Sequence, residues 1–276
     1  MGKHLSIDET ALSKGELYTI ITNKKAKGKK GAIVAVMAGT KVEPIIQQLL
    51  KIPKSKRHKV KEITLDMANS MKLIAKKCFP KAIQVTDRFH VQKLALEALQ
   101  DMRIKHRWEA IDQENEQIKE AKSNRQEFKP ETFKNGDTRK QLLARSRYLL
   151  YKAPNNWTQN KYERAKTLFE QYPDIKRAFG LVQGLRNIFI TATSMQTAYT
   201  KLAHWYKDVE QTGFKAFNTI ANTITINYRT ILNYFINRST NASAESFNAK
   251  IKAFRAQFRG VRNIEFFLFR LTTIFA

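Results

Sequence analysis

The sequence predicts an α/β fold in which a five-stranded mixed sheet is interrupted, along the chain, by a large all-helical insertion. Five short apolar runs fall within the first 90 residues, and helical patterns precede two of them. The stretch from residue 106 to residue 238 then shows helical periodicity without a comparable strand signal. The chain has 276 residues, 42% of them hydrophobic, so it is long enough to bury such a core.

The expected strands are apolar segments bounded by polar residues, glycine or proline. They lie at residues 4–7, 17–22, 31–38, 63–65 and 83–86. Short polar or basic links join the first three strands, whereas a helix precedes each of the last two. This order predicts antiparallel hairpins followed by parallel crossovers, which is the strand and helix order of an RNase-H-like fold.

Two helices between these strands are recognised by apolar residues that recur every three or four positions. Those positions are Ile45, Ile46, Leu49 and Leu50 in the first helix and Met71, Ile74, Ala75 and Cys78 in the second. Pro53 and Pro80 end the two helices. Cys78 is the single cysteine, so the sequence predicts neither a disulfide framework nor a cysteine-rich zinc site, and a reducing cytoplasm fits.

The middle of the chain is predicted to be helical. A helix beginning near Val91 continues to about Lys122, residues 123–137 are a polar loop, and several helices follow. We therefore expect three segments: residues 1–105 as an RNase-H-like core, 106–238 as an all-helical insertion, and 239–276 as helices that complete the core. Tryptophans 108, 157 and 205 are expected to be buried in the insertion rather than stacked on bases.

The charge of the chain predicts a polyanionic partner. Lysine and arginine number 50 against 24 acidic residues, a formal net charge of +26. No segment approaches the roughly 20 consecutive apolar residues of a spanning helix, so nucleic acid is favoured over a membrane. Two basic runs, residues 23–30 and 51–61, flank expected strands, and we expect both to contact phosphates.

Three acidic residues are candidates for binding a metal. Asp8 and Asp66 each follow an expected strand, 58 residues apart (66 − 8), and Glu245 lies 179 residues further on (245 − 66). Hard divalent cations prefer oxygen ligands, and three carboxylates suit a site for two magnesium ions. Taken one at a time, however, an aspartate after a strand is usually a solvated turn or a helix cap.

Glu245 is expected near the start of an amphipathic helix. An apolar stripe there consists of Phe247, Ile251, Phe254 and Phe258. A second face carries Glu245, Asn248, Lys252, Arg255 and Arg259. One carboxylate followed by cations suits a helix that holds a metal ion while its basic residues meet phosphates.

Four blocks of the sequence resemble the insertion-sequence transposases of the ISL-three type, in a branch found with split reading frames. The blocks are LSIDE, ITLDMANSM, FPKAIQVTDRFHVQKLALEALQDMR and RSTNASAESFNAKIKAFRAQFRGVRNIEFFLFRL, and they span Leu5 to Leu271. The resemblance implies a DDE catalytic triad on an RNase-H-like core with a helical insertion before the glutamate. By this resemblance, Asp8, Asp66 and Glu245 form the triad and hold two Mg²⁺ ions, for which Mn²⁺ can substitute.

The segment VTDRFH resembles an element of related transposases, an aspartate or cysteine separated from a histidine by two residues. It places Asp87 and His90 beside the site. For Asp87, a helix N-cap and a catalytic-site role are both open. For His90 we expect contact with DNA or with the acidic cluster in preference to metal ligation. Cations expected to neutralise the DNA backbone are Arg88, Lys250, Lys252, Arg255 and Arg259.

The resemblance implies cleavage at element ends and strand transfer into target DNA, by a homodimer on DNA near the nucleoid. Family members usually carry an amino-terminal zinc finger and a helix-turn-helix, and this chain starts directly at the first expected strand. Either a separately encoded partner supplies end recognition, or this is a fragment whose helical insertion and basic surface suffice. A catalytically silent DNA-binding remnant and an RNase-H-like nuclease are the alternative functions.

Overall fold

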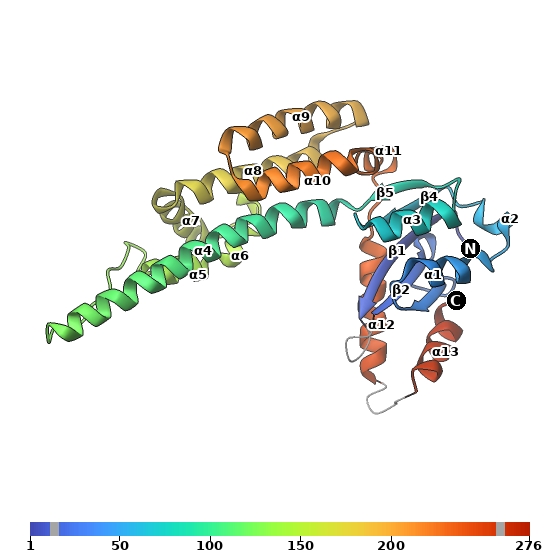
Figure 1. Cartoon of the computed structure of the whole chain (residues 1–276), viewed down its shortest axis with the longest axis horizontal. Helices are drawn as coiled ribbons and strands as arrows, with labels where there is room; N and C mark the ends of the chain where they lie inside the picture. The colour runs from blue at the N-terminus through green and yellow to red at the C-terminus, as the bar shows by residue number, and fades with distance from the viewer. Residues whose placement is uncertain (12–16, 258–262) are drawn as a thin grey trace. The chain divides into compact units, whose positions relative to one another are not determined.

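The computed structural model describes residues 1–11, 17–257 and 263–276 (Figure 1). The chain forms two compact units: unit 1 combines Met1–Val91 with Ile224–Ala276, and unit 2 is Gln92–Thr223. These borders precede the boundaries expected at residues 105 and 238. Helices α4 (Arg88–Ser123) and α10 (Lys215–Leu232) run across the borders, so the sequence pattern shows no break there.

Unit 1 is built on a sheet with the strand order β3-β2-β1-β4-β5. The strands are β1 (His4–Ala11), β2 (Leu17–Asn23), β3 (Ile33–Ala38), β4 (Glu62–Leu65) and β5 (Ile83–Thr86). β1 pairs antiparallel with β2, as does β2 with β3, whereas the β1–β4 and β4–β5 pairs are parallel. The predicted mixed sheet of an RNase-H-like core is therefore confirmed. β1 is longer than expected, so Asp8 lies within the strand and does not follow it.

Alternating apolar residues bury both faces of this sheet. On one face, α1 (Val42–Leu50) and α3 (Asn69–Cys78) pack with side chains that include Leu5, Ile7, Ile21, Ile63 and Leu65. On the other face, α12 (Ala242–Gln257) and α13 (Ile264–Phe275) contribute to a cluster of Tyr18, Ile20, Ala32, Ile33, Phe247, Ile251, Phe267 and Leu271. The shorter elements of unit 1 are η1 (Lys24–Ala26), α2 (Lys54–Arg57) and α11 (Tyr234–Asn237). The helix that carries Glu245 is thus fixed to the sheet by its own apolar stripe.

Unit 2, all of whose residues are described, is helical, as predicted for the insertion. Beyond α4 and α10 it contains α5 (Arg139–Arg145), α6 (Arg147–Leu150), η2 (Pro154–Asn156), α7 (Gln159–Gln171), α8 (Pro173–Thr191) and α9 (Met195–Thr212). The expected polar loop follows α4 and ends at Asp137, whose carboxylate is fully buried. Asp137 accepts hydrogen bonds from Arg145 and, at 2.8 Å, from Arg164 Nε, so it ties the loop to α5 and α7.

The three tryptophans differ in their environments. Trp205 is buried and donates from Nε1 to the Leu181 carbonyl at 2.9 Å. Trp157 lies between η2 and α7, outside a helix, and its ring stacks on Phe179 at 5.5 Å. Trp108 is 60% exposed on α4, so the prediction of burial is wrong for this residue. No helix in the described part of the chain is both long and apolar enough to cross a bilayer.

Candidate active site

Three carboxylates follow one another across the parallel half of the sheet. Ser6 of β1 pairs with Thr64 of β4, and Leu65 of β4 pairs with Thr86 of β5. Continuing this register places Asp8 opposite position 66, and position 66 opposite position 87. Since parallel strands present equivalent positions at the same edge, Asp8 within β1, Asp66 just after β4 and Asp87 just after β5 occupy matching places.

Local hydrogen bonds orient each carboxylate. Asp8 Oδ1 accepts the backbone N–H of Glu9 at 2.9 Å, and Asp66 Oδ1 accepts that of Ala68 at 2.7 Å. Asp87 Oδ1 accepts the backbone N–H of Phe89 at 3.4 Å, at the start of α4. In each case one oxygen is committed to the backbone, which fixes the direction of the side chain.

Helix α12 brings the fourth carboxylate and an amide to this edge of the sheet. Phe247 and Ile251 are buried against the sheet, whereas Glu245, in the first turn, is exposed. Asn248, one turn further on, donates from Nδ2 to Asp8 Oδ2 at 2.5 Å. The sequence placed Asn248 on the same face as Glu245 but did not predict this contact across 240 residues.

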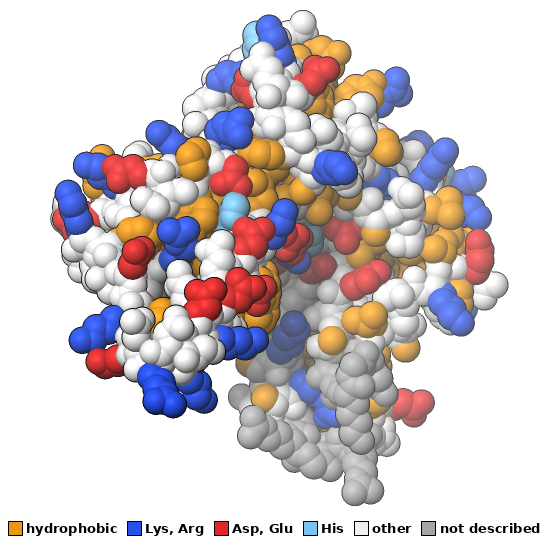
Figure 2. Space-filling model, turned by 60° about the vertical axis from the view of Figure 1, so that its left-hand side comes forward, with side chains coloured by type: hydrophobic (Ala, Val, Ile, Leu, Met, Phe, Trp, Pro, Cys, Tyr) orange, Lys and Arg blue, Asp and Glu red, His pale blue; other side chains and the backbone are white. Residues whose placement is uncertain are grey.

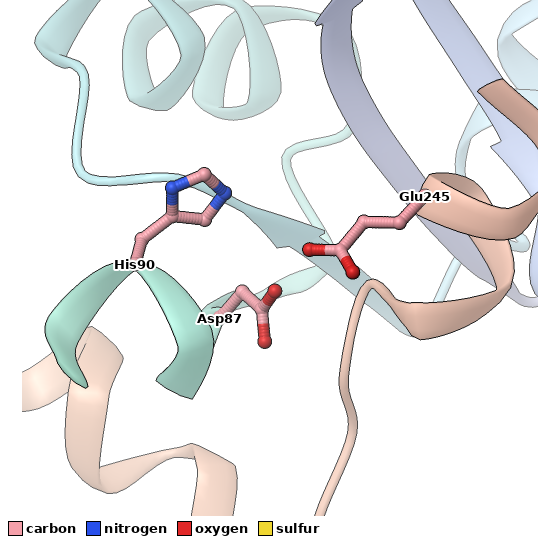
Figure 3. Close-up of side chains that lie close together, drawn as sticks. All are labelled: Asp87, His90 and Glu245. Atoms are coloured by element: carbon pink, nitrogen blue, oxygen red, sulfur yellow. The ribbon is translucent and has the colours of Figure 1, made fainter. Parts of the chain in front are cut away.

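Asp87, His90 and Glu245 converge most closely (Figure 3). One ligand atom from each lies within 4.8 Å of the other two, and the described residues contain no second such group of three. Asp87 accepts the backbone N–H of Phe89, as expected of a cap of α4, and its carboxylate also lies beside His90 and Glu245. Its catalytic-site role stays a prediction. His90 lies in the acidic cluster, one of the two positions expected for it.

The electrostatics of Asp8 reflect this crowding. Burial raises the pKa of the Asp8 carboxyl, and the charges of Asp66 and Asp87 add to the effect. The hydrogen bond from Glu9 and the charge of His90 act in the opposite direction. Bringing several carboxylates together in a partly buried site costs free energy, which a cation between them would offset.

Two glutamates experience the same crowding. Burial raises the pKa of Glu245, and the charges of Asp87 and Asp8 raise it further. His90 lowers the pKa of Glu245. Burial also raises the pKa of Glu9, a residue that sequence reasoning missed, followed by the charges of Asp66 and Asp8. Its position directly after Asp8 in β1 is the sequence signal that was available.

The side-chain oxygen of Asn248 is a second feature that fits a divalent cation. Asn248 is 7% exposed, and its Oδ1 atom has no hydrogen-bond donor among the described residues. An orphaned acceptor beside a carboxylate is satisfied by a cation or by the water that a cation carries. The oxygen-rich set of Asp8, Asp66, Asp87 and Glu245 is the chemistry that such an ion requires.

The expected DNA-contacting cations are placed differently from one another. Lys250 and Lys252 are exposed on α12. Arg88 and Arg255 are half-buried, with their guanidinium groups 5.7 Å from the Tyr234 ring centroid and 5.1 Å from the Phe267 ring centroid, respectively. Arg259 lies outside the described residues. The two lysines thus offer their charge directly to solvent, and the two arginines also pack on aromatic rings.

The two basic runs are mostly exposed, but each contains one structural cation. Lys24 Nζ binds Thr64 Oγ1 at 2.6 Å and Glu62 Oε1 at 3.4 Å. Arg57 is buried and donates to the carbonyls of Ile52 and Cys78. Lys24 and Arg57 therefore form hydrogen bonds within the protein and are not phosphate contacts. Lysines and arginines nevertheless populate the face shown in Figure 2.

A family model for DDE transposases of the ISL3 (ISL-three) type, described as "Transposase", matches residues 5–271. The chain belongs to this transposase family. The membership expected from the sequence blocks is therefore confirmed.

A curated relative agrees with this assignment. The chain is similar to the transposase for insertion sequence element IS1001 from Bordetella parapertussis, with 22% identity over 277 residues. The alignment covers 99% of this chain and 61% of that transposase, so the chain spans about three fifths of the relative's length. No solved structure gives a significant match to the chain.

Proposed function

We propose that this transposase cleaves the phosphodiester bond at the ends of an insertion sequence and joins the freed 3′ ends to target DNA. The observation that supports it best is the gathering of Asp8, Asp66 and Glu245. Burial and mutual charge raise the pKa values of Asp8 and Glu245 there, and Asp66 contributes to the rise at Asp8. Carboxylates gathered in this way are suited to binding cations that act on phosphate oxygens.

In this proposal, Asp8, Asp66 and Glu245 hold two Mg²⁺ ions, for which Mn²⁺ substitutes. When bound, such ions activate the attacking oxygen and stabilise the charge on the leaving oxygen. In the first step water attacks phosphorus and the element's 3′ oxygen leaves. In the second step that 3′ oxygen attacks a target phosphate and displaces a target 3′ oxygen. Asn248 steadies Asp8 throughout through its 2.5 Å hydrogen bond.

Cations near the carboxylates neutralise the DNA backbone. We assign Lys250 and Lys252, exposed on α12, to direct phosphate contact, with Arg88, Arg255 and Arg259 as further contributors. Phosphate contacts supply affinity without reading sequence, and they make binding fall steeply with salt. Recognition of element ends therefore needs a further source, which we propose is a separately encoded or covalently attached DNA-binding domain.

The assembly proposed is a homodimer that holds two element ends, acting on chromosomal DNA in the cytoplasm. A symmetric pair of subunits matches a substrate with two equivalent ends. Mixing of two differently tagged chains with end DNA, followed by affinity capture of one tag, tests the pairing. Recovery of the second tag only when DNA is present is the expected result, and its absence would contradict the dimer.

The central experiment compares the purified chain with its Asp66→Asn variant on labelled duplexes that carry the ends of its own element. We expect magnesium-dependent cleaved and joined products from the chain, and none from the variant. DNA affinity should be nearly unchanged, because the substitution removes a metal ligand and not a phosphate contact. Asp112→Asn, at an exposed position on α4, is the matched control and should keep full activity.

Other outcomes separate the alternative functions. Cleavage without joined products would favour an RNase-H-like nuclease. Salt-sensitive binding without any product would favour a binding-only remnant or a missing partner. Undiminished cleavage by Asp66→Asn would remove the catalytic assignment.

A further inference from the structure

The cluster of Asp87, His90 and Glu245 differs chemically from the rest of the acidic site because it includes a nitrogen ligand. Asp87 caps α4 and His90 lies three residues later, which places both side chains on the same side of the first turn. Glu245 reaches the same point from the first turn of α12 (Figure 3). Two segments far apart in the sequence, the start of α4 and the start of α12, therefore direct an imidazole and two carboxylates at one place.

We propose that Asp87, His90 and Glu245 bind a divalent cation of the Mn²⁺ class at a position of its own, beside the ions held by Asp8 and Asp66. The inference deepens the proposed function, because Glu245 is shared between the two positions. An imidazole with carboxylates suits Mn²⁺ and other first-row ions, whereas Mg²⁺ favours oxygen ligands alone. Three protein ligands leave coordination places for water or a phosphate oxygen.

The burial of Asp87 supports a role in binding a cation. Its side chain is 1% exposed, and one backbone N–H at 3.4 Å is the hydrogen bond that the described residues give to its carboxylate. A buried carboxylate needs more compensation than this. The buried Oδ1 of Asn248, one turn after Glu245 on α12, is a further acceptor that has no hydrogen-bond donor among the described residues.

His90 differs from His106, which lies on the same helix, α4. Both ring nitrogens of His106 are engaged, at 3.0 Å with Glu109 and at 2.6 Å with Asp174. Among the described residues, His90 has a ring contact with Phe89 but no hydrogen bond at either nitrogen. An imidazole nitrogen that faces two carboxylates without a hydrogen bond is suited to ligate a metal. His106 therefore provides the matched control.

Pulsed electron paramagnetic resonance on the Mn²⁺-loaded chain, without DNA, tests the proposal. Direct coordination by imidazole gives a nitrogen modulation of the Mn²⁺ signal. We expect this modulation in the unmodified chain and in His106→Gln, and its loss in His90→Gln. Mn²⁺ affinity in His90→Gln should fall by about tenfold or more. Asp87→Asn should weaken Mn²⁺ binding similarly while the helix stays capped, because asparagine caps as well as aspartate.

The nitrogen modulation tests the cation site separately from the proposed cleavage and joining of DNA. Absence of the modulation from the unmodified chain, or its persistence in His90→Gln, would overturn the cation site even if the chain cuts and joins DNA. Conversely, the modulation with no DNA products would support the cation site and would count against cleavage by this chain alone. Circular dichroism of His90→Gln confirms that any loss of signal does not come from unfolding.

Discussion

Phe247 offers a test of how the site is assembled. Its ring is 1% exposed in the cluster between α12 and the sheet and packs edge-on against Phe275, with the centroids 5.1 Å apart. It lies two residues after Glu245 and one before Asn248. Phe247→Ala should therefore loosen the helix that presents a proposed metal ligand and the partner of Asp8.

The expected magnitude follows from burial. Truncation of a fully buried phenylalanine to alanine costs about 3–5 kcal/mol, from lost transfer free energy and the cavity left behind. The lost aromatic pair is part of that cost, at about 0.5–1.5 kcal/mol. At about 2–4 °C per kcal/mol, a loss of about 4 kcal/mol lowers the melting temperature of a chain of this size by about 8–16 °C.

Differential scanning fluorimetry and Mn²⁺ titration of Phe247→Ala measure both consequences. Phe269→Ala is the control, because that ring lies on α13 and is 63% exposed, so its removal should change stability by less than about 0.5 kcal/mol. Phe247→Leu should be intermediate. If Phe247→Ala were as stable as Phe269→Ala, the docking of α12 on the sheet through this residue would be refuted.

Three further substitutions have defined outcomes. Lys24→Met should destabilise the chain by about 1–3 kcal/mol in chemical denaturation, because the buried Glu62 loses its cation and keeps the hydrogen bond from Asn237. Lys25→Met, at an exposed neighbour, should not destabilise it. Burial alone would raise the pKa of Asp137, but hydrogen bonds from Arg164 and Arg145 outweigh it and lower the pKa from its ordinary 3.8. The ionised Asp137 therefore contributes fully to the free energy of unfolding above pH 3.8. That contribution is lost as the pH falls through the lower pKa of the folded state. Asp137→Asn should flatten the acid limb of a stability–pH curve, and an unchanged limb would contradict the assignment. Asn248→Ala should raise the Mg²⁺ concentration needed for cleavage with little change in melting temperature, whereas an effect confined to stability would reduce Asn248 to a packing role.

The fold could be predicted because its signals are local. Alternation of apolar residues within short segments located all five strands, and three- to four-residue spacing located α1 and α3. The carboxylates at positions 8, 66 and 245 stood out for the same reason, since each adjoins a recognisable strand or amphipathic helix. Their roles as metal ligands remain predictions.

The structural roles of Lys24 and Arg57 could not be predicted, because their partners are distant along the chain. Lys24 reads as one lysine in a basic run, and only the folded sheet brings it to Glu62 and Thr64. Arg57 is recognised as structural only through the Cys78 carbonyl, 21 residues away. Local composition marks such residues as solvated charges, because burial is decided by neighbours that the local pattern does not contain.

The division of unit 1 between Met1–Val91 and Ile224–Ala276 has a consequence for biosynthesis. Asp8, Asp66 and Asp87 leave the ribosome before the 132 residues of unit 2 (223 − 92 + 1), and Glu245 leaves after them. At about 5–20 residues per second, that interval lasts about 7–26 s. Throughout it the nascent sheet has neither Glu245 nor Asn248. Translation therefore sets a delay before a newly made chain can assemble its full set of carboxylates.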